Sequence, residues 1–294
     1  MSKSQSIELL INGDSRRSRQ VVRRVLKLCD RYGLVLDAHY VVRGKNLDAT
    51  LKTIKRRSPA LLIVGSGDGT LSYLVNYFVD TSVKLGIIPL GTTNNFARSL
   101  GLPLELEAAV QTIAKRNTQK IDLGYMEDMY FVNVAGIGIS AVIADNISNA
   151  TKRRYGRFAY AVEGMFQLLK HKSFMVTVED KNGDLQLNFE THQVIIANGR
   201  YHAGREVAVD ASLASRELII FALGGRSKWS FIVAMLDFYL GKRKNSRHAS
   251  YLVGRNVHIS TSSPQPIELD GEVRFNTPCS IQVRPKAVSV VGAL

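Results

Sequence analysis

Residues 61–78 read LLIVGSGDGTLSYLVNYF, which joins a wholly apolar run, a glycine-rich turn and a stretch with apolar residues at helical spacing. The apolar run at 61–64 is typical of a short strand that is covered on both faces. A strand, a turn and a helix in direct succession indicate one unit of a parallel α/β sheet. The side of this helix that we expect to be buried carries Leu71, Leu74, Val75 and Phe78.

The same alternation extends on both sides of this unit. Apolar runs that predict strands lie at 7–11, 34–42 and 85–88, and stretches with helical periodicity lie at 16–32 and 47–57. The second helix is expected to stop at Ser58-Pro59, because the residue before a proline avoids the helical conformation. Residues 1–124 are therefore predicted to form a three-layer α/β domain with a parallel sheet.

The second half of the chain has a different character. Asn182-Gly183 is a strong hairpin signal between two short apolar runs. Residues 125–294 are predicted to form a mainly antiparallel β domain with helical insertions, whose last residues could return to the first domain. The cleft between two such domains is the default place for an active site. Strand candidates lie at 174–178, 185–189, 194–197, 218–222, 257–260 and 281–283, and helical stretches lie at 158–169 and 229–240.

The composition is that of a globular protein with a basic surface. The 294 residues carry a formal net charge of +14 at pH 7, which favours nucleic acid, anionic membranes or phosphate-bearing substrates as partners. No nucleic-acid-binding module is recognisable, so nucleic acid is not expected among the partners. The apolar stretch 229–240 is too short to span a bilayer, and residues 1–13 lack the apolar segment of a secretory signal. Cys29 and Cys279 are expected to be reduced core thiols, as in a cytoplasmic protein.

The turn at 65–70, Gly-Ser-Gly-Asp-Gly-Thr, places glycines, a carboxylate and a hydroxyl between a strand and a helix. Glycines let backbone amides approach phosphate oxygens, and a helix N-terminus adds partial positive charge. Asp68 could hold Mg²⁺ directly or through water. The alternative is a tight turn in which Asp68 is only a cap. The turn has neither the lysine of a Walker A loop nor the GxGxxG of a dinucleotide-binding fingerprint.

A second loop, at 89–98, follows the next predicted strand and reads PLGTTNNFAR. In open α/β sheets, ligands bind at the carboxyl ends of the strands. Together the two loops resemble the GGDGT and PLGT-x-NDFAR signatures of the diacylglycerol kinase catalytic domain family, which includes sphingosine kinases, ceramide kinases and bacterial lipid kinases. Further segments that resemble this family follow in order at 121–124, 131–138, 155–160, 198–204 and 270–272.

The resemblance implies a lipid kinase that uses ATP and Mg²⁺, with a fold like that of NAD kinases and diacylglycerol kinases. It implies that Asp68 anchors the Mg²⁺ network as a catalytic residue, that Asp122 helps to hold the metal through water, and that Glu272 is the general base for the lipid hydroxyl. Without the resemblance, Asp270-Gly271-Glu272 is only a turn between strands. His202 could approach the substrate, but a lone histidine is more often structural. The residues implied to hold the nucleotide are Asn12, Arg16, Gly65, Ser66, Gly67, Asp68, Gly69, Thr70, Leu71, Ser72, Gly91 and Thr92.

Several positions depart from the family's pattern. Asn12 is followed by Gly-Asp-Ser-Arg-Arg in place of the usual proline, and the two arginines could clamp phosphate in bidentate fashion. Ser66 replaces the first glycine of GGDGT, and Tyr73 stands where the family often has glutamate. Asn95 replaces the aspartate of NDFAR, which removes a negative charge near the metal and weakens the expected Mg²⁺ binding. Ser215-Arg216 replaces an acidic turn that can hold a structural Mg²⁺ in bacterial relatives, so this second metal site is expected to be absent.

Three functions remain open at this point: a lipid kinase, an NAD kinase of related fold, and a nucleotide or lipid sensor with little turnover. The loop at 89–98 and the late Asp-Gly-Glu favour the lipid kinase over the NAD kinase. Asp68 and Glu272 weigh against the sensor, whereas Asn95 and the altered Ser215 segment weigh for it. The sequence does not choose among diacylglycerol and other lipids that carry a hydroxyl.

A lipid substrate implies peripheral contact with the inner face of the membrane. The basic residues after the apolar stretch 229–240 could receive anionic headgroups, and the alternative is a buried helix followed by a solvated loop. A homodimer is a further hypothesis that no motif supports. The basic residues are Lys242, Arg243, Lys244, Arg247, His248 and Arg255.

Overall fold

The computed structural model describes residues 6–13, 18–42, 44–146, 164, 166–202, 204–206, 208, 210–241 and 246–292. The chain forms two compact units. The first comprises Met1–Leu123 together with Arg284–Leu294, and the second comprises Gly124–Val283. Strands β5 (Thr118–Met126) and β18 (Cys279–Val291) each have residues in both units.

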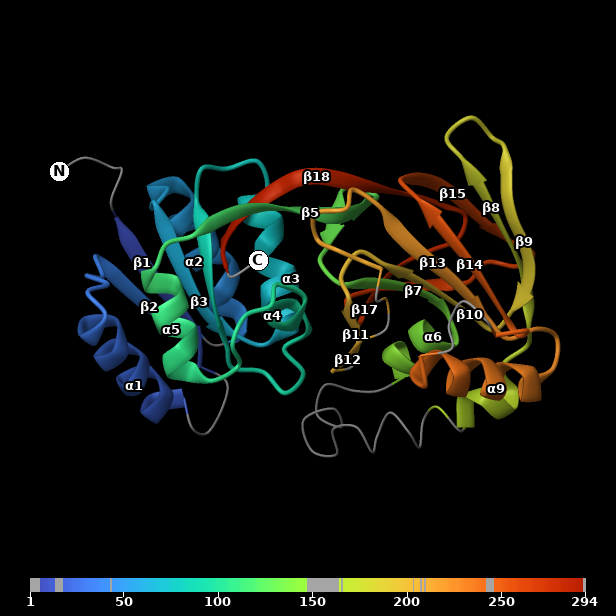
Figure 1. Cartoon of the computed structure of the whole chain (residues 1–294), viewed down its shortest axis with the longest axis horizontal. Coiled ribbons are helices and arrows are strands. Elements are labelled where there is room, and N and C mark those ends of the chain that lie inside the picture. The colour runs from blue at the N-terminus through green and yellow to red at the C-terminus, as the bar shows by residue number, and fades with distance from the viewer. Residues whose placement is uncertain are drawn as a thin grey trace. The chain divides into compact units, whose positions relative to one another are not determined.

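The first unit is built on a parallel sheet (Figure 1) with the strand order β2-β1-β3-β4-β18. Every residue of β3 is buried, as expected for a short apolar strand that is covered on both faces. β18 joins the sheet through residues 289–291, which pair with β4. The other strands are β1 (Ile7–Asn12), β2 (Ala38–Val42), β3 (Leu61–Ser66) and β4 (Lys84–Pro89).

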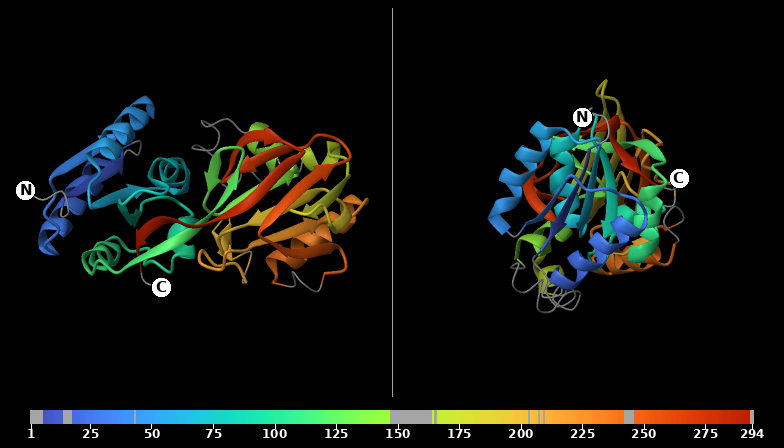
Figure 2. Two further views of the ribbon diagram at one scale, coloured as in Figure 1. Left: turned by 90° about the horizontal axis from the view of Figure 1, so that it is seen from above. Right: turned by 90° about the vertical axis from the view of Figure 1, so that its left-hand side faces the viewer.

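Helices cover both faces of this sheet, which confirms the predicted three-layer α/β arrangement. As Figure 2 (left) shows, α1 (Ser18–Arg31) and α5 (Leu106–Ala114) lie on one face, and α2 (Leu47–Arg57) and α3 (Asp68–Phe78) lie on the other. Their side chains fill the core because apolar residues recur at helical spacing: Leu71, Leu74, Val75 and Phe78 of α3 are all buried, as predicted. Two short helices complete the unit, the 3₁₀ turn η2 (Gly44–Asn46) and α4 (Asn95–Ser99).

The strand predicted at 34–42 begins only at Ala38, and its first residues belong to the end of α1 instead. Gly33 has a φ of 70°, and the N–H of Leu34 donates to the carbonyl of Cys29 at 2.8 Å. The Leu34 side chain is buried in the core beneath α1. A left-handed glycine followed by an apolar residue that packs back on the helix is a common helix end. The apolar pattern at 34–36 therefore reports a helix end rather than a strand.

The second unit contains a six-stranded sheet in the order β14-β13-β10-β7-β16-β17, in which all neighbours are antiparallel. Strands β8, β9, β15 and the first part of β18 form a second antiparallel layer, and β5 pairs with β6. Apolar side chains of the two layers form one core. The bounds are β6 (Met129–Phe131), β7 (Val134–Gly138), β8 (Phe174–Asp180), β9 (Leu185–Thr191), β10 (Gln193–Ala197), β13 (Leu218–Leu223), β14 (Ala249–Gly254), β15 (Asn256–Thr261), β16 (Pro266–Leu269) and β17 (Glu272–Asn276).

In the described part of the chain, α6 (Ile139–Asn146) and α9 (Lys228–Tyr239) pack against the other face of the six-stranded sheet. α6 packs through Ile139, and α9 packs through Phe231, Ala234 and Phe238. A small separate ribbon is formed by β11 (Tyr201–His202) and β12 (Arg205–Glu206). The antiparallel character and the helical insertions confirm the prediction for this half. Most of the helix predicted at 158–169 lies outside the described residues, and residues 166–170 are helical.

The predicted hairpin is present between β8 and β9, but its turn is longer than two residues. Residues 181–184 connect the strands, and the Asp180 carboxylate accepts the N–H groups of Asn182 and Asp184 at 2.8 and 3.1 Å. Gly183 supplies the positive φ, at 86°. Cys29 and Cys279 are buried and free, as predicted. Within the described ranges, no helix combines the length and apolar character needed to cross a membrane.

Candidate functional site

Two loops of the first unit touch through their glycines. A Cβ added to Gly91, after β4, would come within 2.7 Å of the Cα of Gly67, after β3, and within 2.9 Å of Asn94 Oδ1. The reverse substitution at Gly67 would place a Cβ 3.2 Å from the Cα of Gly91. The N–H of Leu90 also donates to the carbonyl of Ser66 at 3.0 Å. The loops that sequence analysis singled out separately are therefore one structural unit.

The carboxylate of Asp68 links the two loops through hydrogen bonds. Asp68 begins α3, but its Oδ2 accepts the hydroxyl of Thr93 at 2.8 Å and the N–H of Asn95 at 2.9 Å, and its Oδ1 accepts the N–H of Phe96 at 3.0 Å. Asn95 and Phe96 are the first residues of α4, whose N–H groups have no partner inside the helix. Asp68 is thus a cap, as the simpler alternative held, but it caps α4 rather than its own helix.

Asn94 closes the second loop, and sequence reasoning gave it no role. Its backbone is left-handed, with a φ of 49°. Its Oδ1 accepts the N–H of Gly91 at 2.8 Å, and its Nδ2 donates to the Gly91 carbonyl at 3.0 Å. The residue type alone could have indicated this role, because asparagine tolerates a positive φ and its side chain often forms hydrogen bonds with the backbone of its own loop.

The start of α3 is open to a ligand. Its N-cap residue is Gly67, which has no side chain to cap the helix; among the described residues a Cβ at Gly69 would meet no atom within 4 Å, and Gly69 and Thr92 are exposed. Asn12, at the end of β1, donates from Nδ2 to Thr70 Oγ1 at 2.8 Å and so joins a third strand end to this helix. Backbone N–H groups at such a helix start are suited to phosphate oxygens. Arg16 lies outside the described residues.

Three of the residues predicted to hold the nucleotide have structural contacts within the turn. The Leu71 side chain is buried in the core, and its N–H donates to the Gly67 carbonyl at 3.2 Å, so it offers a phosphate no group of its own. Ser66 is buried, and its hydroxyl donates to the Gly67 carbonyl at 3.3 Å. A Cβ at Gly65 would lie 3.0 Å from a methyl group of the Leu90 side chain, which would have to shift slightly. That these three residues also contact a nucleotide stays a prediction.

Asp68 and Asp122 could supply only a few of the ligands of a Mg²⁺ ion, because both carboxylates already accept hydrogen bonds from the protein. Asp68 already uses three of its roughly four lone-pair positions. Asp122 is buried in β5, and its Oδ1 accepts the N–H of Lys286 at 2.8 Å. Within the described part of the chain, no three His, Cys, Asp or Glu side chains gather as a metal-ligand group. These residues fit an ion that keeps most of its waters and is held mainly by nucleotide phosphates, which is the usual habit of Mg²⁺.

In the second unit, Asp270 builds the turn that carries Glu272. Asp270 and Gly271 connect β16 to β17 with φ values of 49° and 92°, and Leu269 pairs with Glu272 across the turn. The Asp270 carboxylate accepts three consecutive N–H groups, those of residues 132, 133 and 134, at 2.8, 2.9 and 3.0 Å. Asp-Gly is a typical two-residue hairpin turn. The turn that sequence analysis weighed as the simple alternative is therefore present, and it fixes the backbone beside Glu272.

Glu272 itself is accessible. Its side chain is 59% exposed and forms an ion pair with Arg274, two residues along β17. A carboxylate in this position can accept a proton from a bound hydroxyl, and the neighbouring guanidinium can hold its orientation. His202 lies on β11, opposite Arg205. The hydroxyl of Ser215 donates to the carbonyls of Ser212 and Glu217 within its own loop.

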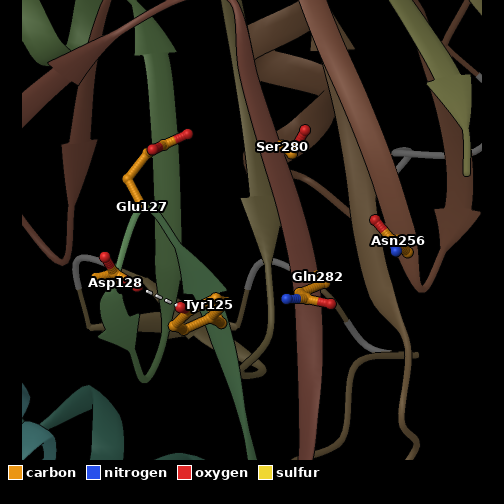
Figure 3. Close-up of a pocket in the computed structure, with 6 residues that line it drawn as sticks. All are labelled: Tyr125, Glu127, Asp128, Asn256, Ser280 and Gln282. Carbon is orange, nitrogen blue, oxygen red and sulfur yellow. Dashed lines mark hydrogen bonds between the residues drawn. The ribbon is translucent and has the colours of Figure 1, made fainter.

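A polar cavity of about 420 Å³ in the second unit contains none of the predicted site residues. Figure 3 shows Glu127 and Asp128 extending from the turn between β5 and β6, with the Tyr125 hydroxyl donating to Asp128 at 2.7 Å. Its other lining residues are Asn256 of β15 and Ser280 and Gln282 of β18. None of the residues discussed above lines this cavity.

Two imidazoles form an unusual contact elsewhere in the second unit. The Nδ1 atoms of His171 and His192 lie 3.2 Å apart, so one ring must donate and the other accept. Burial, then the charges of His192 and Lys228, lower the pKa of His171 to about 4. Burial also lowers the pKa of His192. Both rings are therefore neutral near pH 7, and the ring that accepts this hydrogen bond must be neutral in any case.

The predicted residues thus fall into two groups. The first unit brings together Asp68, Gly67, Gly91 and the start of α3, and the second unit holds Asp270 and Glu272 on one hairpin. That the two groups face a common cleft stays a prediction.

Known proteins share both halves of this chain. Residues 6–126 match the family described as diacylglycerol kinase catalytic domain, and residues 133–292 match the YegS C-terminal NAD kinase beta sandwich-like domain. A Bacillus subtilis (strain 168) protein named diacylglycerol kinase is 28% identical over 252 residues, which are 85% of this chain and 83% of that protein. An uncharacterized Synechocystis protein is 27% identical over 79% of this chain, and the match spans only 54% of that relative. A crystal structure of a diacylglycerol kinase from Bacillus anthracis str. Sterne has a TM-score of 0.75 at 20% identity, covering 100% of this chain and 98% of that one, which shows a common fold.

Proposed function

The chain belongs to the diacylglycerol kinase catalytic domain family, and on that premise we propose that it transfers the γ-phosphate of ATP to the hydroxyl of a membrane lipid, diacylglycerol or a related one. The observation that carries the proposal is the pair of loops locked together by Gly67, Gly91 and the Asp68 carboxylate. Phosphoryl transfer depends mainly on positioning and on charge stabilisation. Two loops joined by these contacts, beside a helix start whose N-cap residue is Gly67, support this role for a triphosphate.

The nucleotide phosphates would lie against the start of α3. The candidate donors to these phosphates are the backbone N–H groups near the exposed Gly69, the Thr70 hydroxyl and the exposed Thr92. Mg²⁺, when bound, supplies charge neutralisation at the phosphates, and Asp68 and Asp122 would hold it through water. Asp68 then has two tasks, because the same carboxylate that caps α4 keeps one oxygen position for the hydrated ion.

Glu272 would be the general base. As the lipid oxygen forms its bond to the γ-phosphorus, the bond to the β-phosphate oxygen breaks, ADP leaves, and the hydroxyl proton passes to the Glu272 carboxylate. The exposure of this carboxylate, its Arg274 partner and the Asp270 turn beneath it support the assignment. The acceptor is a membrane lipid, so we further propose that the protein works at the cytoplasmic face of an anionic membrane, to which its net charge of +14 would attract it.

The test is transfer of label from ATP labelled at the γ-phosphate to a panel of lipids in anionic mixed micelles with Mg²⁺. Glu272→Gln keeps the shape of the side chain and should lower kcat by about 10²-fold or more. Glu217→Gln is the matched control, because Glu217 is also a partly exposed glutamate paired with an arginine, Arg255. It should retain full activity.

Each outcome assigns a function. Label in one lipid class that Glu272→Gln abolishes would support the proposal and name the substrate. Equal rates for Glu272→Gln and Glu217→Gln would remove Glu272 as the base. If the folded protein binds ATP and labels no lipid, NAD is the acceptor to try next, because the second unit matches an NAD kinase beta sandwich-like domain. If neither lipid nor NAD is labelled, a nucleotide or lipid sensor with little turnover becomes the favoured function.

A further inference from the structure

Helix α9 is apolar on nearly all sides, yet only one side is covered. Phe231, Ala234 and Phe238 are buried against the six-stranded sheet. On the outer side, Trp229 is 71% exposed, Leu236 57% and the following Leu240 72%. A helix that is apolar all round is normally buried all round. The alternative raised from the sequence, a buried helix, therefore holds only for the side of α9 that packs on the sheet.

A second helical segment extends the exposed apolar surface. Residues 166–170, yellow-green beside α9 in Figure 1, carry Phe166 and Leu169, which are 59% and 68% exposed. The Lys228 ammonium group donates to the carbonyl of Leu169, so the two segments are in direct contact. We call this surface the apolar ridge, and it consists of Phe166, Leu169, Trp229, Leu236 and Leu240.

Basic side chains flank the apolar ridge. Lys170, Lys172, Arg226 and Lys228 are all exposed. Residues 166–173 and 224–230 contain no acidic residue, and the one acidic residue of α9, Asp237, is partly buried and accepts the hydroxyl of Ser246 at 2.8 Å. A tryptophan and leucines next to lysines and arginines are the composition of a helix that lies in a membrane interface.

We propose that the apolar ridge is the surface through which this protein docks on an anionic lipid bilayer, with Trp229 at headgroup level and the flanking lysines and arginine against anionic headgroups. This rests on the proposed function, which puts the acceptor lipid in a membrane. Charge complementarity favours a bilayer over a second copy of this chain as the partner of the ridge. Two copies facing each other across this ridge would bring the basic side chains of one against those of the other, whereas an anionic bilayer satisfies the apolar and the basic side chains together.

Trp229 is the only tryptophan of the chain, so its fluorescence reports on the ridge alone. Vesicles of phosphatidylglycerol and phosphatidylcholine should shift its emission to the blue and protect it from acrylamide, and vesicles of phosphatidylcholine alone should do so much less. High salt should weaken binding, because exposed charges are screened within a Debye length of about 10 Å at 0.1 M salt. Unchanged Trp229 emission in the presence of vesicles that sediment the protein would overturn the proposal.

Variants test the rest of the ridge. Leu236→Glu should weaken co-sedimentation with the anionic vesicles roughly tenfold or more, because it places a charge where an apolar side chain would be buried. Leu185→Glu is the matched control, since Leu185 is an equally exposed leucine of the same unit, at 60%, on β9. Its vesicle affinity should match the wild type. Circular dichroism and thermal melting check the fold, and Leu240→Ser, at a more exposed position, replaces Leu236→Glu if that variant does not fold.

The outcomes separate this proposal from the proposed function. Vesicle binding that Leu236→Glu weakens and Leu185→Glu does not would support the ridge even if no lipid were ever labelled. Lipid labelling by the wild type with equal vesicle affinity of both variants would overturn the ridge and leave the kinase intact. Light scattering tests whether a second copy of the chain covers the ridge instead. A dimer that Leu236→Glu dissociates, in a protein that binds no vesicles, would also overturn the proposal.

Discussion

The contact between Gly67 and Gly91 shows what a glycine-rich signature needs at the residue scale. Gly67 has an ordinary extended backbone, with a φ of −92°, so its conformation alone would admit other residues. What restricts them is the neighbouring loop, because a Cβ at Gly67 would lie 3.2 Å from the Gly91 Cα, and a Cβ at Gly91 would lie only 2.7 Å from the Gly67 Cα. Gly69, only two residues along, has open space around its Cα. Glycines of one short motif therefore carry different constraints.

Alanine substitutions should separate these constraints. Gly91→Ala must push the two loops apart, so we expect a loss of about 1–3 kcal/mol of unfolding free energy and a higher KM for ATP. Gly69→Ala meets no atom and lies in a helix, so it should be neutral or gain up to about 1 kcal/mol. Urea denaturation of both variants measures this. A Gly91→Ala protein with wild-type stability and KM would contradict the close contact.

The pair of His171 and His192 predicts a pH dependence of stability. Burial lowers the pKa of His171 to about 4, below the roughly 6.5 of an unfolded chain. The unfolded state therefore binds more protons between these values, and stability should fall as pH drops from about 6.5 towards 4. His171→Leu should flatten this part of a Tm-against-pH curve. His258→Leu, which removes an exposed imidazole, is the control, and equal flattening in both variants would contradict the role of His171.

At the scale of elements, one hairpin turn carries both a structural and a functional residue. Asp270 anchors the backbone of residues 132–134, and Glu272 is the second residue after it. Asp180 does a comparable task in the β8–β9 hairpin, where its carboxylate accepts two N–H groups of its own turn. The two turns differ in what they hold in place, because only the Asp270 turn precedes a candidate base.

This difference can be measured. Asp270→Ala leaves three N–H groups without their acceptor, so we expect a loss of about 1–3 kcal/mol of stability and a lower kcat with little change in KM. Asp180→Ala should also cost stability, yet kcat should be that of the wild type. Steady-state kinetics and urea denaturation on the same samples test both. Equal losses of kcat in the two variants would show that the Asp270 turn does not position Glu272.

Elements could be predicted from the sequence where burial made the pattern uniform. β3 and β4 are continuous apolar runs, and α3 repeats its apolar residues at helical spacing. β14 and β17 were not predicted, because none of their residues is fully buried and their sequences mix polar with apolar types. The Asp68 cap of α4 was not foreseen because it joins residues 27 and 28 positions apart, which no local periodicity reports.

At the scale of the whole molecule, the chain returns to its first unit at its very end. Residues 289–291 of β18 pair with β4, and Val288, Val290 and Val291 are buried there. β4 leads directly into the loop that holds Gly91. The sheet beneath the proposed nucleotide site thus depends on residues at the opposite end of the sequence, so the two units cannot be separated by a single cut.

Val290→Ala should therefore weaken the nucleotide-binding unit although it lies far along the chain from the phosphate loops. The cavity left in a fully buried site should cost about 2 kcal/mol. ATP should raise the Tm of this variant, because a ligand that binds only the folded state stabilises it by mass action. Val253→Ala, at a 40% exposed position of β14, is the control and should change stability by less than about 0.5 kcal/mol. Equal melting of the two variants would show that β18 contributes little to the sheet that carries Gly91.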